Sequence, residues 1–181
     1  MRTPKISALH RLIDWLNARL DGKSKIPISS EIDNSPLGNN PWLTGFIESD
    51  GNFYCSFNLA PRRGTKGIAG IVKSYMRISQ NQIYKTSSDT LLVGVAANYS
   101  NSQIMGEIRE FLNVKTVNEI KRIKKDYVEL AYEVRTTKKA SCDILINYLS
   151  AYPLFSSKHQ DFLDWREIHR IRLSRCLPSF A

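Results

Sequence analysis

The spacing of apolar residues changes several times along the chain, and the first stretch has the spacing of a helix. From Thr3 to Leu20 one stripe recurs every three or four positions. Its members are Ile6, Leu9, Leu12, Ile13, Leu16 and Leu20. Residues 21–40 are rich in Gly, Ser, Pro and Asn, which is typical of a linker. We therefore expect an N-terminal amphipathic helix and linker over residues 1–40, with the helix docked on a domain formed by residues 41–181.

A short helix is predicted directly after the linker. Asn40 is a good capping residue, and Pro41 suits the first turn, where a proline costs no hydrogen bond. The helix then runs from Trp42 to Asp50, and Gly51 is the expected stop. Two small residues, at positions 45 and 49, are four apart and share one face. The pattern predicts a helix that another helix can approach closely and that ends in a carboxylate.

Two strands follow, because the period changes to two after Gly51. In the first strand the apolar side consists of Phe53, Cys55, Phe57 and Leu59, and the polar side of Asn52, Tyr54, Ser56 and Asn58. In the second strand, 71–80, the inward residues are Val72, Met76 and Ile78, and the outward ones are Lys73, Tyr75, Arg77 and Ser79. A basic loop, 61–67, joins the two strands into a hairpin.

The second half of the chain repeats this order. A helix is expected from Asn101 to Asn113, then strands over 116–123 and 127–135, then helices over 141–151, capped by Ser141, and 158–175. In the last strand the expected core side consists of Val128, Leu130, Tyr132 and Val134, and the outward side of Glu129, Glu133 and Arg135. An outward glutamate can accept from a cytosine amine in the major groove, but the favoured interpretation is that both are ion-paired surface residues. Residues 91–95 are read as a further strand. The whole pattern predicts an α+β fold.

Composition adds a partner class. The chain has 26 Lys and Arg against 17 Asp and Glu, a formal net charge of +9 and a pI of about 9.6. This balance favours a polyanion, with nucleic acid ahead of a membrane surface. No apolar run is long enough for a membrane span, so no membrane partner is expected. The three cysteines lack metal-ligand spacing and are expected to be reduced and mostly buried, and the three histidines form no metal-site pattern.

The stretch LTGFIESDG, Leu43–Gly51, resembles the LAGLIDADG motif position by position. Residues 152–165, YPLFSSKHQDFLDW, also resemble the closing signature of the mitochondrial branch of that family. The chain is thus similar to LAGLIDADG homing endonucleases and intron maturases, and to the second half of members that carry two motifs. The resemblance implies an αββαββα unit whose curved, antiparallel four-stranded sheet forms a saddle for nucleic acid.

The same resemblance implies a catalytic site. Asp50 would bind a divalent cation, Mg²⁺, at the DNA backbone. Gln80 and Lys158 would order water and steady the charge of the transition state. The motif helix would meet a second motif helix through Leu43, Gly45, Ile47 and Ser49, either in a homodimer or with a separate first-half chain.

The polar faces of the predicted hairpins supply the expected nucleic-acid contacts. A β-ribbon of this kind fits the major groove of double-stranded DNA, where side chains can read base edges. The expected contact residues are Tyr54, Ser56, Asn58, Arg62, Arg63, Lys66, Lys73, Tyr75, Arg77, Lys121, Lys124, Lys125 and Arg135.

Two functions follow from the resemblance. The first is a Mg²⁺-dependent, site-specific DNA endonuclease of the homing type, located in the mitochondrion. The alternative is a protein of this fold without cleavage activity that binds structured RNA. Such a protein would act as a group I intron maturase or as a structural part of an organellar ribonucleoprotein such as the mitoribosome.

Overall fold

The computed structural model describes residues 2, 6–20, 25–28, 33–61, 68–83 and 100–174. The elements are α1 (Ile6–Asn17), the short 3₁₀ helix η1 (Leu37–Asn39), α2 (Trp42–Asp50), β1 (Gly51–Pro61), β2 (Ile68–Asn81), α3 (Ser102–Phe111), β3 (Asn118–Ile123), β4 (Val128–Thr136), α4 (Lys139–Ala151) and α5 (Lys158–Ser174). The predicted strand over 91–95 lies outside the described residues.

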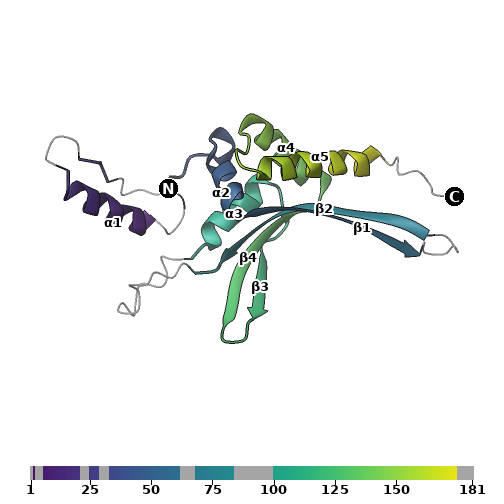
Figure 1. Ribbon diagram of the computed structural model, residues 1–181, viewed down its shortest axis with the longest axis horizontal. Coiled ribbons are helices and arrows are strands. Elements are labelled where there is room, and N and C mark those ends of the chain that lie inside the picture. Colours follow the sequence, from purple (N-terminus) through teal and green to yellow (C-terminus); the bar gives the residue numbers. More distant parts are fainter. Residues whose placement is uncertain are drawn as a thin grey trace.

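Four strands form one antiparallel sheet in the order β1-β2-β4-β3. Helices α2 and α5 contact β1 and β2, and α3 contacts β4. The helices thus cover one face of the sheet, and the two hairpins diverge beyond them, so that the opposite face is concave (Figure 1). The predicted αββαββα order and the α+β class are confirmed.

The core lies between the helices and the central part of the sheet. Leu43 and Ile47 of α2 are fully buried there, as are Met76 and Ile78 of β2. Phe53 of β1 contacts two aromatic rings of α5, with ring centroids 5.6 and 5.5 Å apart. The motif helix α2 therefore packs on β1 and β2, the two strands that follow it in the sequence.

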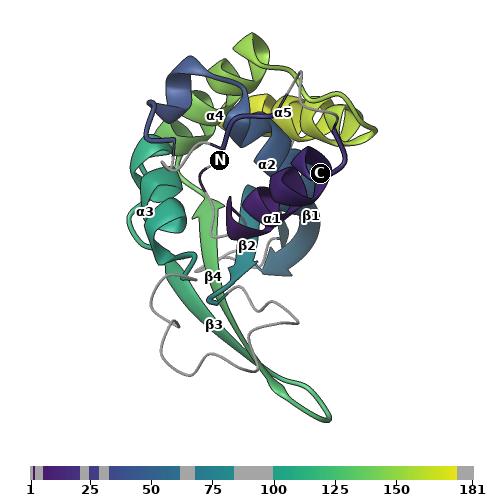
Figure 2. The same ribbon diagram turned by 90° about the vertical axis from the view of Figure 1, so that its left-hand side faces the viewer.

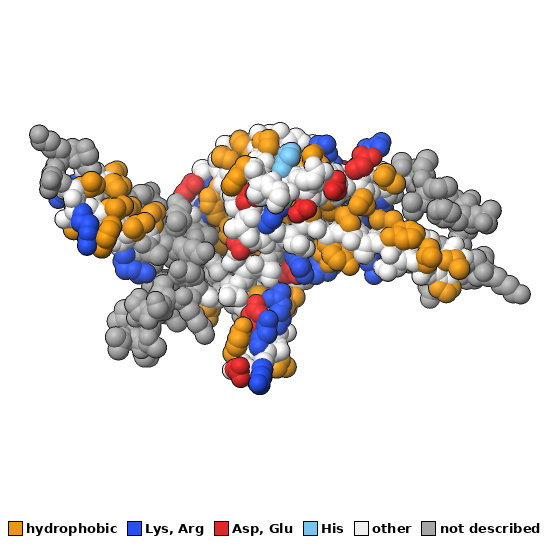
Figure 3. Space-filling view, viewed as in Figure 1, with side chains coloured by type: hydrophobic (Ala, Val, Ile, Leu, Met, Phe, Trp, Pro, Cys, Tyr) orange, Lys and Arg blue, Asp and Glu red, His pale blue; other side chains and the backbone are white. Residues whose placement is uncertain are grey.

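The outer halves of both hairpins extend beyond the helices, and here the predicted core is wrong. Phe57 and Leu59 of β1 are 55% and 66% exposed, and Val128 and Leu130 of β4 are about as exposed, at 50% and 48%. Cys55 is exposed too, whereas Cys142 is buried. The alternation gives the correct face of the sheet, but none of the described helices covers that face so far out along the strands (Figures 1 and 3).

Helix α1 stands apart from the sheet instead of docking on it (Figures 1 and 2). Of the predicted stripe, Ile13 is buried, whereas Leu9, Leu12 and Leu20 are exposed. The end of α1 is held by the returning chain, since the Asn17 side chain pairs with both backbone groups of Ile26. The prediction that this stripe packs on the domain is therefore wrong. No helix in the described residues is long and apolar enough to cross a membrane.

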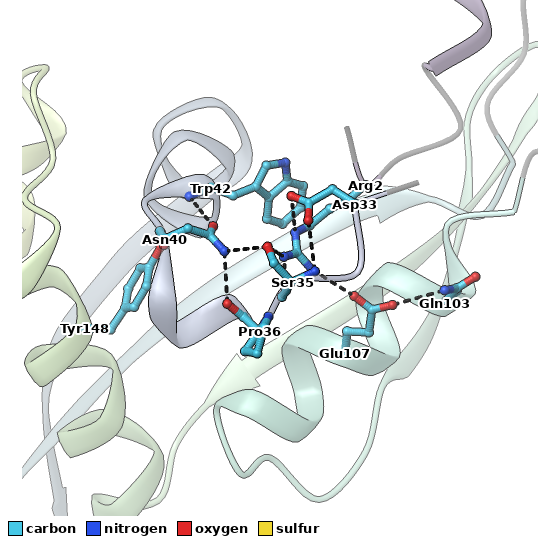
Figure 4. Close-up of polar contacts among 9 residues, drawn as sticks. All are labelled: Arg2, Asp33, Ser35, Pro36, Asn40, Trp42, Gln103, Glu107 and Tyr148. Carbon is cyan, nitrogen blue, oxygen red and sulfur yellow. Dashed lines mark hydrogen bonds and ion pairs between the residues drawn. The ribbon is translucent and has the colours of Figure 1, made fainter. Parts of the chain in front are cut away.

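Arg2 connects the start of the chain to the domain (Figure 4). Its side chain is 2% exposed and lies 3.5 Å from the Asp33 carboxylate and 3.6 Å from that of Glu107. It also donates to Ser35 and lies over the Trp42 ring, 5.7 Å from its centroid. A buried charge needs this many partners to offset its desolvation. Residues 33–40 are thus packed against α2 and α3, and a domain boundary at residue 40 stays a prediction.

Gly51 is required for close packing rather than for an unusual backbone conformation. Its φ of −78° is accessible to any residue. A Cβ atom at this position would lie 2.7 Å from both the carbonyl oxygen and Cγ2 of Ile47. We expect Gly51→Ala to destabilise the fold by about 1–3 kcal/mol, because Ile47 is buried and cannot move aside. Urea unfolding measures this change. Gly106→Ala on α3, where the added methyl meets no atom within 4 Å, is the matched control and is expected to be neutral or slightly stabilising.

Candidate nucleic-acid interface and motif-helix site

The start of the motif helix α2 is fixed by polar contacts with α4. Helix α2 begins at Trp42, so Pro41 and not the predicted Asn40 occupies the N-cap position. The Asn40 side chain nevertheless accepts from the Trp42 amide at 3.0 Å. The Tyr148 hydroxyl accepts from the Thr44 amide at 3.1 Å and donates to the Asn40 carbonyl at 2.9 Å. Desolvation raises the pKa of this phenol, so it stays a neutral donor and acceptor. These hydrogen bonds therefore fix the orientation of α2 relative to α4.

One face of α2 is left open. Gly45 and Ser49 are exposed, and a Cβ atom at position 45 would meet no atom within 4 Å. Leu43 and Ile47 are 0% exposed because they fill the core of the chain itself. The prediction that these two residues belong to a helix–helix interface is therefore wrong. Only the small-residue face is available to a second helix.

Asp50 is exposed at the last turn of α2, as the sequence predicts. One of its carboxylate oxygens lies 2.6 Å from the Ser49 hydroxyl. No group of three or more His, Cys, Asp or Glu side chains with the arrangement of a metal site occurs among the described residues. Mg²⁺ commonly uses only one or two carboxylates and takes its other ligands from water and phosphate. An exposed carboxylate such as that of Asp50 has the chemistry that this role requires.

Lys158 and Glu48 connect the end of α2 to the start of α5. The Lys158 ammonium donates to the carbonyls of Ile47, Glu48 and Gly51 at 3.1, 2.8 and 2.8 Å. In return, the Glu48 carboxylate accepts from the amides of Phe155 and Ser156 at 2.5 and 3.0 Å, and from the Ser156 hydroxyl. Desolvation alone would raise the pKa of Glu48, but the hydrogen bonds from Ser156 and Phe155 hold it below its ordinary value. We call this arrangement the Glu48–Lys158 clasp.

Gln80 lies near the end of β2, opposite Tyr132 of β4, and is half-buried. The register puts it on the helix-covered face, together with Ile78. Within the described residues no hydrogen bond joins Gln80 to Asp50 or Lys158. Lys158, by contrast, binds backbone carbonyls on both sides of Asp50 in the sequence. The role of Gln80 stays a prediction.

The concave face of the sheet has a cationic and aromatic centre. Tyr54 and Tyr75 stack with ring centroids 4.6 Å apart, and the Arg135 guanidinium lies 4.4 Å from the centroid of the Tyr75 ring. Arg77 and Arg135 are register partners, and both pair with Glu133, at 3.9 and 2.7 Å. Glu133 is only 2% exposed, and its two ion pairs hold the guanidinium groups of Arg77 and Arg135 beside each other on this face.

Further out, Ser56 and Asn58 lie on the same face as Lys73, which is opposite Ser56 in the register. Lys73 is exposed and has no ion-pair partner among the described residues. Lys124 and Lys125 are exposed in the turn between β3 and β4, and Lys124 lies 3.6 Å from Glu129. Three further predicted contact residues, Arg62, Arg63 and Lys66, lie outside the described residues.

Hairpin β3–β4 corrects one predicted contact and adds another. Lys121 is paired with Leu130, which puts both on the helix side of the sheet, away from the concave face. The neighbouring Arg122 is on the concave face instead, where it pairs with Glu129 at 2.7 Å. The prediction for Lys121 is therefore wrong by one residue. Both outward glutamates are ion-paired, as expected, and charges of both signs follow this hairpin (Figure 3).

A small cavity beside the end of β4 brings the predicted contact residue Arg135 together with two basic residues that were not predicted, Lys115 and Lys138. Its volume is about 150 Å³, and its lining includes Lys115, Arg135 and Lys138 together with several hydroxyl groups. Ser141, predicted to cap α4, lies inside that helix and donates to the Asn113 carbonyl at 2.9 Å. Positive charge thus extends from the concave face to the start of α4.

Comparison with known proteins agrees with this geometry. The family model described as LAGLIDADG endonuclease matches residues 43–169. The intron-encoded DNA endonuclease aI3 of Saccharomyces cerevisiae is 27% identical over 93% of this chain. The chain spans 42% of that relative's length.

Solved structures show the same fold. The homing endonuclease I-TnaI has a TM-score of 0.50 at 20% identity, covering 75% of this chain and 74% of that one. The LAGLIDADG meganuclease I-CpaMI, solved bound to uncleaved DNA, has a TM-score of 0.50 at 16% identity, covering 75% of this chain and 39% of that one. The match to the family model extends from Leu43 in the motif helix to His169 in α5, which is well over half of the chain. The chain therefore belongs to the LAGLIDADG endonuclease family.

Proposed function

We propose that this chain is the DNA-binding and DNA-cutting unit of a homing-type endonuclease. The observation that carries the proposal is the position of Asp50. It is an exposed carboxylate at the end of a helix whose open face is formed by small residues, and the helix leads directly into a strand of the concave, basic face. The named relatives, a DNA endonuclease and a meganuclease solved with DNA, support the same substrate.

Phosphodiester hydrolysis requires an activated water and neutralisation of charge on the phosphate, and a bound Mg²⁺ would supply both. Asp50 would hold the cation against the DNA backbone. The concave face would hold the duplex through Lys73, Arg77 and Arg135. The stacked Tyr54 and Tyr75 rings and the polar residues of β1 would contact the base edges.

One chain contributes one motif helix, so the active assembly needs a second. A homodimer would place two copies of Asp50 together and would read a nearly palindromic site, because its two halves are related by symmetry. A separate first-half chain would give an asymmetric site. In both cases the contact would form at the open face of α2. A mitochondrial location, which the resemblance of residues 152–165 to the mitochondrial branch of the family implies, belongs to the same proposal.

Digestion of genomic and organellar DNA of the source organism with the purified protein and Mg²⁺, followed by sequencing of the new ends, tests the proposal. We expect cleavage at one or a few sites. The absence of new ends, together with tight binding of structured RNA, would favour an RNA-binding protein of this fold and would contradict the proposal.

Removal of one positive charge from the concave face should weaken DNA binding and reduce its dependence on salt. Lys73 is the best probe, because no carboxylate in the described structure neutralises it. We expect Lys73→Ser to lower the slope of log K against log salt by about one, which is the effect of one lost phosphate contact. Fluorescence anisotropy on a mixed-sequence duplex over a salt series measures this slope.

Lys121→Ser is the matched control, since it removes the same charge from the opposite face of the sheet. It should leave the slope unchanged. Equal slopes for both variants, or a larger loss for Lys121→Ser, would place the binding surface elsewhere.

A further inference from the structure

The Glu48–Lys158 clasp joins α2 and α5 through reciprocal hydrogen bonds, in which a side chain of each helix binds backbone groups at the end of the other or beside it. The last carbonyls of a helix have no partner within the helix and carry a partial negative charge. Lys158, the first residue of α5, donates to two of these carbonyls in α2 and to that of Gly51. Glu48, within α2, accepts from two amides just before α5. Lys158 thus binds backbone carbonyls at the end of α2, and Glu48 binds backbone amides of the turn that precedes α5.

Lys158 forms hydrogen bonds with backbone carbonyls on both sides of Asp50 in the sequence. The carbonyl of Glu48 lies two residues before Asp50 and that of Gly51 one residue after it, and both accept from the same ammonium. A change in the backbone dihedral angles at Asp50 would therefore break at least one of these bonds. An ammonium group has three donors, and all three are directed at main-chain carbonyls. No donor of Lys158 is left for a phosphate in this arrangement.

We infer that Lys158 is a positioning residue, which fixes the backbone that carries Asp50, and that Glu48 supports it by holding the turn before α5. This inference rests on the proposed function, because it assigns the means by which the metal-binding carboxylate is held in place. It differs from the role that family resemblance gives Lys158, which is direct stabilisation of charge in the transition state. Groups that orient a metal ligand commonly change metal affinity when they are replaced.

Lys158→Met separates the two roles, because it keeps the aliphatic chain and removes the three donors. We expect the affinity of the protein–DNA complex for Mn²⁺, measured by electron paramagnetic resonance with a mixed-sequence duplex, to fall by about tenfold to a hundredfold. The salt slope of DNA binding should stay that of the wild type. Lys139→Met, at the corresponding first position of α4, is the matched control and should change neither quantity.

Lys158→Arg sharpens the test, since it keeps the charge but has a planar fork of donors that does not match three converging carbonyls. We expect it to lose Mn²⁺ affinity as Lys158→Met does. Recovery of Mn²⁺ affinity in the arginine variant would overturn the inference. A salt slope about one unit lower in Lys158→Met, with Mn²⁺ affinity unchanged, would also overturn it and assign Lys158 to a phosphate contact.

A measurement on the free chain keeps the inference separate from the proposed function. In ¹H–¹⁵N spectra without DNA or metal, Lys158→Met should shift the amide signals of Gly51 and Asn52 and leave that of Gly106 on α3 in place. If Lys158→Met does not fold, Glu48→Gln, which keeps one acceptor oxygen, should shift the same two signals by a smaller amount. Unshifted signals would contradict the positioning role, whereas a wild-type chain that binds no DNA would contradict only the proposed function.

Discussion

Replacement of Asp50 by asparagine is expected to abolish Mg²⁺-dependent DNA cleavage while leaving DNA affinity within about threefold of the wild type. The amide is nearly isosteric with the carboxylate and can still accept from the Ser49 hydroxyl, so the helix end should keep its shape. The charge that binds the cation is lost. Because bound metal contributes several kcal/mol to the stability of the transition state, we expect the rate to fall by about a thousandfold or more.

Single-turnover cleavage of the target found by end sequencing measures this loss, with binding followed in parallel by anisotropy. Asp161→Asn, in the exposed first turn of α5, is the matched control and should cut at the rate of the wild type. An Asp50→Asn variant that cuts normally would show that the site has been assigned to the wrong carboxylate.

The second large effect is expected at Gly45, on the open face of α2. A Cβ atom added here meets no atom of the chain within 4 Å, so we expect Gly45→Leu to fold with nearly unchanged stability as an isolated chain. At a closely packed interface between two helices, accommodating the same side chain would cost about 1–3 kcal/mol. Association of the two motif helices should therefore weaken by about tenfold to a hundredfold, and cleavage should fall with it.

Sedimentation of the protein–DNA complex measures the number of chains bound, and circular dichroism measures the stability of each variant. Gly106→Leu on α3, at the other described helix glycine with open space around it, should alter neither assembly nor cleavage. An unchanged complex in Gly45→Leu would place the interface on another surface of the chain.

The sequence was sufficient for the motif helix and for the order of the elements. Helical spacing and a glycine stop define α2, and strict alternation defines both faces of β1 and β2. Alternation does not say how far the helices reach over a strand. For this reason Phe57 and Val128, on the correct face of the sheet, are nevertheless exposed.

Strand β3 shows a different limit. Its two isoleucines, Ile120 and Ile123, are three residues apart and so lie on opposite faces of the sheet. The strand therefore has no apolar side from which its register could be inferred. Only the pairing with β4 shows that Arg122, rather than Lys121, is on the concave face.

The side-chain contacts around the motif helix could not be predicted from the sequence for a third reason, which is that their partners lie far apart along the chain. Glu48 and Lys158 are 110 residues apart, and Arg2 is brought against Trp42 and Glu107. Local spacing carries no signal for such pairs. The family resemblance singled out Lys158, but its three carbonyl partners became apparent only in the folded chain.

The central claim, that this chain binds and cuts DNA, is tested most directly by crosslinking the protein in its native compartment and sequencing the nucleic acid bound to it. We predict recovery of one DNA locus at the boundary of an intron insertion site. Recovery of intron RNA or ribosomal RNA in its place would contradict the claim and would show that the fold serves to bind RNA, with Asp50 as a structural residue.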